Sequence, residues 1–272
     1  REAWSSRDAR EGFDAPNGPP AFFTSLEHWY LQTATTLGRR TGELHLALAN
    51  AFDPAFAPEP LDRTALDTVA EEMLLHVKAG FDLLAQRIST LDEVSRTHAD
   101  AILSHRADLL GRFGRMRALD SAGWRIRIHG DYHLGQVLRT EEDFVILDFE
   151  GEPARSIEER RVKQSPLRDV AGMIRSYSYA AYAALFAFTT HAPGDYARLE
   201  PWADAWQHWV AGSFLAAYDT TLANTEFAPS PAAWRLLLDA FVLDKAFYEL
   251  AYELNNRPDW VRIPLIGIRK LI

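Results

Sequence analysis

Two short polar motifs lie close together near the middle of this 272-residue chain. The first is HGDYHLGQ at residues 129–136, and the second is DFE at residues 148–150, after an apolar stretch and a turn-like TEED. In phosphoryl transfer a protein holds magnesium on the nucleotide phosphates and places an aspartate beside the attacking hydroxyl. Acidic side chains at the ends of two neighbouring strands could do both. The two motifs therefore indicate phosphoryl transfer.

The spacing within the motifs supports this chemistry. Kinases carry H-R-D-L-x-x-x-N followed by D-F-G, and here the interval from aspartate to amide is kept, with Gln136 where asparagine usually stands. Asp148 and Phe149 reproduce the start of the second motif. In a simpler interpretation, Asp131 and Asp148 only cap turns on a buried hairpin. That interpretation does not account for the occurrence, in this order, of the HGD tripeptide, the Gln136 amide, a hairpin and the Asp148-Phe149 pair.

The elements that must position these motifs are mostly helical. A period of three to four between apolar residues predicts helices at about 24–50, 64–88, 91–113, 167–190, 196–223 and 231–255. Short strands are expected on either side of the 129–136 loop and after the turn, and residues 152–166 are expected to form a polar, arginine-rich loop. Ser230 followed by Pro231 is a typical helix start. The fold class is therefore mostly α with a small β element (α+β).

Five runs of sequence resemble maltokinase, an enzyme related to aminoglycoside phosphotransferases and often fused behind trehalose synthase. These runs are GRRTGELHLALA, RIHGDYHLGQVL, VILDFEGEP, SPLRDVAGMIRSYSYAAYAAL and DKAFYELAYELNNRPDWVRIPL. The resemblance implies a two-lobed, protein-kinase-like fold of which this chain is the carboxy-terminal lobe. It also implies ATP-dependent phosphorylation of the anomeric hydroxyl of maltose, giving maltose 1-phosphate for α-glucan (glycogen) synthesis.

Carried over to this sequence, the resemblance assigns a role to each residue of the motifs. Asp131 would orient or deprotonate the sugar hydroxyl, whereas Gln136 and Asp148 would bind Mg²⁺ and, through it, ATP. Glu150 stands where protein kinases have glycine, and it is either a further metal ligand or a solvated turn residue. His129 is expected to brace the loop by hydrogen bonding and not to transfer a proton.

Support and acceptor residues are expected on the helices that follow. Arg168 and Asp169 open a helix, where an aspartate complements the positive helix end, and in kinase-like folds this position can also brace the catalytic loop. The acceptor sugar is expected on one helical surface formed by Lys245, Tyr248, Glu249 and Tyr252. The alternative is that the two tyrosines are core aromatics and Lys245 extends outward. A similar stripe, Trp202, Trp206 and Trp209, is expected to pack in the core.

Composition limits the classes of partner. The chain has 29 basic and 38 acidic residues, and its net charge of −9 opposes non-specific binding to nucleic acid or to an anionic membrane. It has no cysteine, no apolar signal-peptide core and no apolar run of the length that spans a bilayer, so a cytoplasmic setting is expected. Residues 1–23 resemble a linker or hinge, and residues 24–272 are expected to form the helical lobe, with the loop and hairpin at about 125–150.

A complete kinase also needs a glycine-rich loop and a strand lysine that pairs with the phosphates. Neither pattern occurs in this sequence, which predicts a missing amino-terminal lobe and a fragment that is inactive or nearly so. Three hypotheses are open: a maltokinase fragment, another small-molecule kinase acting on glucosamine or an aminoglycoside, and a non-catalytic lobe that docks a fused trehalose synthase.

Overall fold

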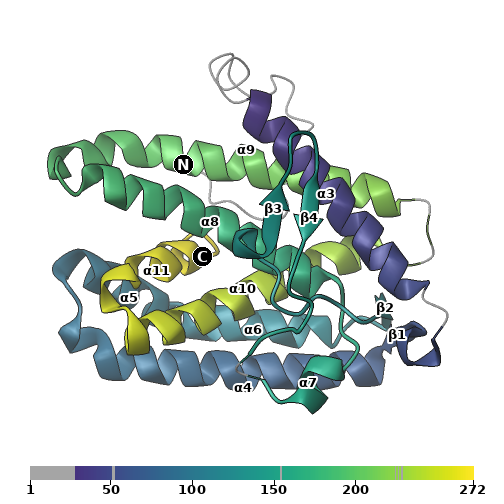
Figure 1. Ribbon diagram of the computed structural model, residues 1–272. Coiled ribbons are helices and arrows are strands. Elements are labelled where there is room, and N and C mark those ends of the chain that lie inside the picture. Colours follow the sequence, from purple (N-terminus) through teal and green to yellow (C-terminus); the bar gives the residue numbers. More distant parts are fainter. Residues whose placement is uncertain (1–27, 51–52, 154, 224, 226, 228) are drawn as a thin grey trace. The chain divides into compact units, whose positions relative to one another are not determined.

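The computed structural model describes residues 28–50, 53–153, 155–223, 225, 227 and 229–272, and the expected linker at 1–23 lies outside them. The described chain forms two compact units. The first comprises residues 61–122 and 229–272, and the second comprises residues 28–60 and 123–227. The predicted region 24–272 therefore contains two units, each of which has its own helices (Figure 1).

The first unit is almost entirely helical. Its elements are α4 (Arg63–Arg87), the 3-10 turn η2 (Ile88–Thr90), α5 (Glu93–Ser104), α6 (Arg106–Met116), α10 (Pro231–Asn256), η5 (Pro258–Trp260) and α11 (Arg262–Arg269). Helix α4 packs against α6 and α10, and α11 packs against α5 and α10. Two paired strands, β1 (Glu59–Asp62) and β2 (Ser121–Arg125), carry the chain from one unit to the other.

The second unit contains the two polar motifs. Its elements are α3 (His28–Ala49), η1 (Pro54–Phe56), η3 (Leu134–Gln136), β3 (Val137–Arg139), β4 (Phe144–Ile146), α7 (Ile157–Arg161), α8 (Leu167–Thr189), η4 (Pro193–Asp195) and α9 (Tyr196–Leu222). Strands β3 and β4 form an antiparallel hairpin in which Leu138 pairs with Val145. Helix α9 packs against both α3 and α8. No helix within the described ranges is long and apolar enough to cross a membrane.

Most helix boundaries follow from local signals. Asp62, Asp92 and Ser230 each accept a hydrogen bond from a first-turn amide, as N-cap residues do. The predicted start of α10 at Ser230 and Pro231 is therefore confirmed. The helices predicted at 167–190, 196–223 and 231–255 are confirmed to within one residue at each end.

The face that helix α3 buries does not include its large aromatic residues Trp29 and Tyr30. Its buried positions recur at intervals of three and four and are mostly small: Ala34, Leu37, Gly38, Thr41, Gly42, His45 and Ala49. Trp29 and Tyr30 are instead exposed by about half. A stripe of small residues lets two helix backbones approach closely, and a β-carbon on Gly38 would lie only 2.1 Å from the Phe214 carbonyl oxygen on α9. Close approach to α9 therefore selects the buried face of α3.

The tryptophan stripe on α9 is not a core stripe. Trp202 is 49% exposed, and Trp206 and Trp209 are only partly buried. The interior face of α9 carries Val210, Phe214 and Tyr218 instead. The expectation of core packing was wrong for the stripe as a whole, although Trp206 packs edge-on against Tyr30 of α3 and Tyr177 of α8, with ring centroids 6.0 and 6.3 Å apart.

Two further local predictions need correction. The helix predicted at 91–113 is two helices, since the chain turns at Ser104 and His105 without proline or glycine. The expected loop at 152–166 contains α7, which a Ser156–Glu159 capping box initiates. Helix α11 also contains Pro264, which it tolerates because this proline is its third residue, where the missing amide hydrogen would have had no partner within the helix.

We expect Gly38→Ala to lower the free energy of unfolding by about 1–3 kcal/mol, because the added methyl group forces α3 away from the backbone of α9. Chemical denaturation monitored by circular dichroism measures this change. Gly111→Ala on α6 is the control, since open space surrounds its added methyl group. It should leave stability unchanged or raise it by up to ~1 kcal/mol. Equal effects of the two variants would contradict the close approach of α3 and α9.

Candidate active site

The 129–136 loop begins where the chain leaves β2 and passes Ile126, which pairs with Gln164. His129 is buried, and both of its ring nitrogens have partners. Its Nε2 lies 2.7 Å from the Leu147 carbonyl oxygen, and its Nδ1 accepts from the Asp131 amide at 3.3 Å. His129 thus links the loop to the strand that precedes Asp148. Gly130 has a φ of +85°, a left-handed conformation that favours glycine over residues with a β-carbon.

The Asp169 carboxylate holds this loop through hydrogen bonds to its backbone amides. Its Oδ2 accepts from the His129 amide at 2.8 Å and its Oδ1 accepts from the Gly130 amide at 2.9 Å, and the residue is only 2% exposed. Asp169 lies in the first turn of α8, yet it makes no side-chain cap there. Its carboxylate acts on the loop instead, and it fixes the two residues that precede Asp131. Arg168 points elsewhere and donates to the Gln164 side chain at 2.7 Å.

Two further contacts fix the rest of the loop. The Tyr132 hydroxyl lies 2.8 Å from Thr41 Oγ1 on α3, and burial raises the pKa of Tyr132, so its hydroxyl stays protonated. Ser176 Oγ on α8 accepts from the Leu134 amide at 2.9 Å. The Asp131 side chain is 17% exposed and lies 3.8 Å from His133 Nε2. The loop backbone is thus fixed from both sides, and the Asp131 carboxylate keeps some access to solvent.

The structure brings Gln136 and Asp148 together. Gln136 Nε2 donates to Asp148 Oδ2 at 2.9 Å, and the Leu147 amide donates to the Gln136 carbonyl oxygen. Asp148 has a φ of +61°, the only positive value among the described non-glycine residues. A left-handed aspartate stores backbone strain, which occurs most often at functional sites. No described contact joins Asp131 to Asp148.

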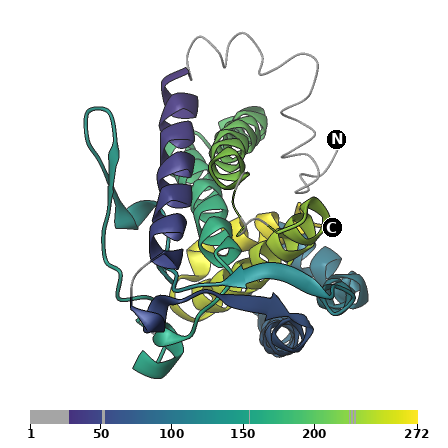
Figure 2. The same cartoon turned by 90° about the vertical axis from the view of Figure 1, so that its right-hand side faces the viewer.

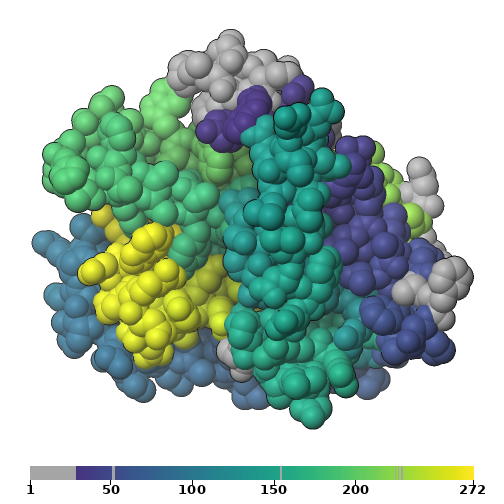
Figure 3. All heavy atoms as spheres, in the orientation of Figure 1, coloured from purple at the N-terminus to yellow at the C-terminus, as the bar shows by residue number. Residues whose placement is uncertain are grey.

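The hairpin that carries these residues lies beside α3 (Figure 2). Arg40 on α3 donates through Nε and Nη2 to both carboxylate oxygens of Asp143, at 2.7 and 2.6 Å, and it also pairs with Glu43. Hydrogen bonds from Arg40, and then from the Phe144 amide, lower the pKa of Asp143 to about 2. The hairpin and the residues after it form a ridge on the face shown in Figure 3. The Arg40–Asp143 ion pair, which is accessible to solvent, thus holds the turn of the hairpin against α3.

The donors present at this ridge fit a magnesium ion. Magnesium is commonly held by one or two protein carboxylates and completes its octahedron with water and phosphate oxygens. Asp148 offers a carboxylate and Gln136 offers an amide oxygen once its amide group is turned around, and both are accessible. Glu150 is exposed nearby in sequence. Among the described residues no three His, Asp or Glu side chains form a metal site by themselves, so the remaining ligands would come from the nucleotide and water.

The expected acceptor residues lie on α10, in the other unit. The Lys245 ammonium lies 4.6 Å from the centre of the Tyr248 ring, and Glu249 is only 8% exposed. Tyr252 is 46% exposed and faces the Arg257 guanidinium at 5.2 Å. Tyr252 is therefore not a core aromatic residue, and it is more exposed than Tyr248.

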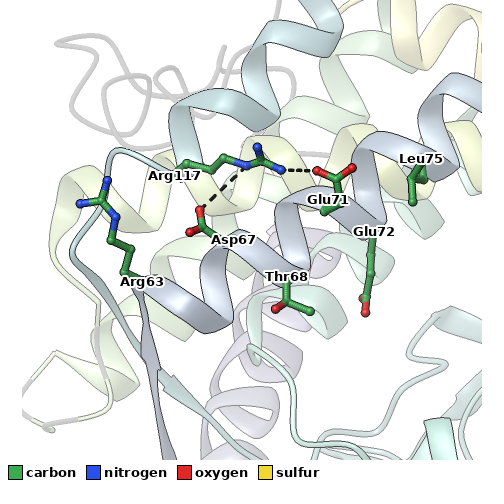
Figure 4. A pocket seen from close by; sticks show the side chains of 7 residues that line it. All are labelled: Arg63, Asp67, Thr68, Glu71, Glu72, Leu75 and Arg117. Atoms are coloured by element: carbon green, nitrogen blue, oxygen red, sulfur yellow. Dashed lines mark hydrogen bonds and ion pairs between the residues drawn. The ribbon is translucent and has the colours of Figure 1, made fainter.

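A broad surface hollow on the first unit is separate from all of these residues. It is lined by Arg63, Asp67, Thr68, Glu71, Glu72, Leu75 and Arg117 (Figure 4). Arg117 points to Asp67 and Glu71, with which it forms ion pairs. The charges in this hollow are thus largely compensated, and they give no reason to place chemistry there.

Four residues that support the loop and hairpin were not predicted from the sequence: Arg40, Thr41, His45 and Ser176. All four lie on helices far from the motifs along the chain. Their helical spacing was visible, but nothing in it distinguishes a residue that faces a loop from one that faces a neighbouring helix.

We expect the contribution of the Arg40–Asp143 pair to hairpin stability to disappear in acid. The Asp143 carboxylate has a pKa of about 2 in the folded protein and ~3.9 in the unfolded chain. The contribution of the pair is therefore complete above pH ~4 and is lost as the pH falls towards 2. Arg40→Met should thus lower the unfolding midpoint at pH 6 and progressively less below pH 4, and 1 M salt should reduce the difference. Arg63→Met, which removes a pair to the 95% exposed Asp120, should have little effect at any pH. If the difference in unfolding midpoint between the wild type and Arg40→Met does not vary with pH, the ion pair is not its cause.

The chain is similar in sequence to two glucosamine kinases. The glucosamine kinase of Mycolicibacterium smegmatis is 30% identical over 245 residues, which are 89% of this chain and 54% of that protein. The glucosamine kinase of Streptacidiphilus jiangxiensis is 30% identical over 152 residues, which are 54% of this chain and 32% of that protein. No family model matches the chain.

Solved structures agree with these sequence relatives. A glucosamine kinase in complex with glucosamine, ADP and inorganic phosphate superposes with a TM-score of 0.69 at 24% identity, covering 89% of this chain and 52% of that chain. Crystal form B of a glucosamine kinase gives 0.67 at 25% identity, covering 89% and 53%. The chain thus spans about half the length of the first relative and of each of these structures. It has the kinase-like fold of the matched half of these sugar kinases.

Proposed function

We propose that this chain supplies the catalytic loop and metal-binding hairpin of a sugar kinase that transfers the γ-phosphoryl group of ATP to a sugar hydroxyl. The observation that carries the proposal is the contact between Gln136 and Asp148, on a hairpin that His129 ties to the Asp131 loop. An amide and a carboxylate side by side, together with a separately held aspartate, are among the parts that phosphoryl transfer requires.

Asp131 is the residue that acts on the acceptor. Its carboxylate is partly exposed at a loop whose backbone is held by Asp169, so it can accept a hydrogen bond from a sugar hydroxyl and orient it for attack. His129 stays a brace, because both of its nitrogens are already used. Asp169 holds the loop backbone and Arg168 donates to the Gln164 side chain, so neither is assigned a contact with the substrate.

Gln136 and Asp148 bind the nucleotide through Mg²⁺, which neutralises charge on the phosphates when it is bound. The outer face of the hairpin supports a nucleotide as well. Leu138 and Val145 lie directly opposite each other and are both about half exposed, so they form an apolar surface next to the Gln136–Asp148 pair. A flat purine base would cover such a surface with little loss of polar hydration.

Glucosamine is the acceptor that the comparisons favour, because both sequence relatives are glucosamine kinases. Maltose is the second candidate. Tyr252 is half exposed and suits stacking of a neutral sugar on the ring face that Arg257 does not cover, and the Lys245 ammonium nearby on α10 disfavours a cationic amino sugar at that surface. Lys245, Tyr248, Glu249 and Tyr252 stay the proposed acceptor residues, with buried Glu249 in a supporting place.

The decisive experiment is an acceptor screen with the protein as its natural gene encodes it, using ATP and Mg²⁺ with glucosamine, maltose and an aminoglycoside. We expect phosphorylation of a sugar, glucosamine first, and a fall in kcat of ~10²–10⁴-fold in Asp131→Asn, because the hydroxyl loses its hydrogen-bond acceptor. Asp120→Asn, at a 95% exposed side chain, is the matched control and should keep wild-type kcat.

Two outcomes would overturn this proposal. One is the absence of ATP consumption with every acceptor, and the other is full activity of Asp131→Asn. A chain that still binds a trehalose synthase after Asp131→Asn, without any phosphorylation by the wild type, would favour the docking hypothesis instead.

Magnesium titration separates Asp148 from Glu150. Asp148→Asn should raise the Mg²⁺ concentration for half-maximal activity at least ~10-fold, because the site loses its one assigned carboxylate. Glu150→Gln should change it by less than about twofold if the exposed Glu150 is a solvated turn residue. Similar shifts in both variants would instead make Glu150 a second metal ligand.

A further inference from the structure

A chain of buried polar groups continues from Asp169 away from the loop. His45 Nε2 on α3 lies 3.1 Å from Asp169 Oδ2, and His45 Nδ1 lies 2.9 Å from the Tyr218 hydroxyl on α9. All three residues are almost fully buried, at 2% exposure or less. Loop, α8, α3 and α9 are thereby connected through side chains that the phosphoryl-transfer chemistry does not use.

One arrangement of hydrogens satisfies every group in this chain. The His45 Nε2–H donates to Asp169, and the Tyr218 hydroxyl donates to His45 Nδ1. Burial, and then the nearby Asp169 carboxylate, raise the pKa of Tyr218, so its hydroxyl keeps the proton that it donates. In this arrangement Asp169 accepts three hydrogen bonds, two from loop amides and one from His45.

Asp169 is 2% exposed, so its carboxylate is largely shielded from water. Mostly apolar side chains line the small cavity beside His45: Leu46, Ala49, Trp124, Ile126, Pro166, Leu222 and Phe227. A carboxylate in such surroundings depends on each donor that it has, because lost hydrogen bonds are not replaced by water. Without His45, Asp169 Oδ2 would keep only the His129 amide, and the carboxylate could rotate away from Gly130.

We infer that His45 and Tyr218 are positioning residues, which orient the Asp169 carboxylate and thereby hold Asp131 in its place for reaction with the acceptor hydroxyl. The inference rests on the proposed sugar-kinase function for its catalytic consequence. Its structural part, the hold on the loop amides, is independent of that function. The chain also offers a matched control. Tyr177 on α8 is a buried tyrosine of the same unit, and its hydroxyl has no hydrogen-bond partner among the described residues.

The test compares Tyr218→Phe with Tyr177→Phe in the full natural protein. Hydrogen exchange of the His129 and Gly130 amides, followed by NMR, should be about tenfold faster in Tyr218→Phe and unchanged in Tyr177→Phe. In the phosphorylation assay, kcat should fall about tenfold in Tyr218→Phe, the rate equivalent of one buried hydrogen bond, while KM for ATP and sugar stays within about twofold.

A second pair of variants guards against a general folding defect. His45→Gln can still donate from its amide to Asp169, whereas His45→Ala cannot, so His45→Gln should recover part of the exchange protection and of kcat that His45→Ala loses. A denaturant midpoint recorded for each variant shows that the folded state is being compared.

Unchanged exchange at His129 and Gly130 in Tyr218→Phe would overturn the inference, as would unchanged kcat in a protein whose wild type is active. Equal losses in Tyr218→Phe and Tyr177→Phe would also overturn it, because both would then report loss of packing alone. If the wild type phosphorylates no sugar, the proposed function fails, and the exchange measurement still decides whether His45 and Tyr218 hold the loop.

Discussion

The site depends on one buried carboxylate that must be fully hydrogen-bonded. Asp169 is only 2% exposed, and an incompletely hydrogen-bonded carboxylate is strongly destabilising when it is buried. Two of its three donors are backbone amides of the loop, so the loop cannot leave without exposing the charge to an unfavourable environment. The same interaction that stabilises the interior therefore sets the backbone conformation immediately before Asp131. Packing and active-site geometry are joined at this residue.

The helices serve this arrangement in different ways. Helix α8 carries Asp169 and Ser176, which contact the loop directly, and α3 supplies Thr41 and His45 from the other side. The small residues on α3 let α9 come close enough for Tyr218 to reach His45. The hairpin, in contrast, is fastened at its turn by a solvent-accessible pair, and its outer face is open. Rigid support of the loop and an accessible hairpin suit the proposed site, in which Asp131 stays fixed while a nucleotide enters and leaves.

Much of this was readable in the sequence, for physical reasons that also explain what was not. Periodicity and caps located the long helices, since local chemistry decides where a helix begins. The motif spacing identified Asp131, Gln136 and Asp148 as candidates, and the structure places Gln136 beside Asp148. Which face of α3 is buried, and that His45 meets Asp169, depend on how helices pack far apart in sequence. The tryptophan stripe misled for the same reason, because helical spacing alone does not reveal which face a neighbour covers. The acceptor surface on α10 carries the weakest sequence signal, since aromatic and charged residues at helical spacing also occur on ordinary packing helices.

The left-handed backbone at Asp148 has a consequence for how this protein tolerates change. A residue with a β-carbon occupies that conformation at an energetic disadvantage, and glycine would relieve it. Replacement by glycine would therefore favour the folded backbone while removing the carboxylate that the proposed metal site requires. At this one position the demands of stability and of the proposed chemistry oppose each other, and a library selected only for heat resistance would drift towards well-folded molecules that lack the proposed metal ligand.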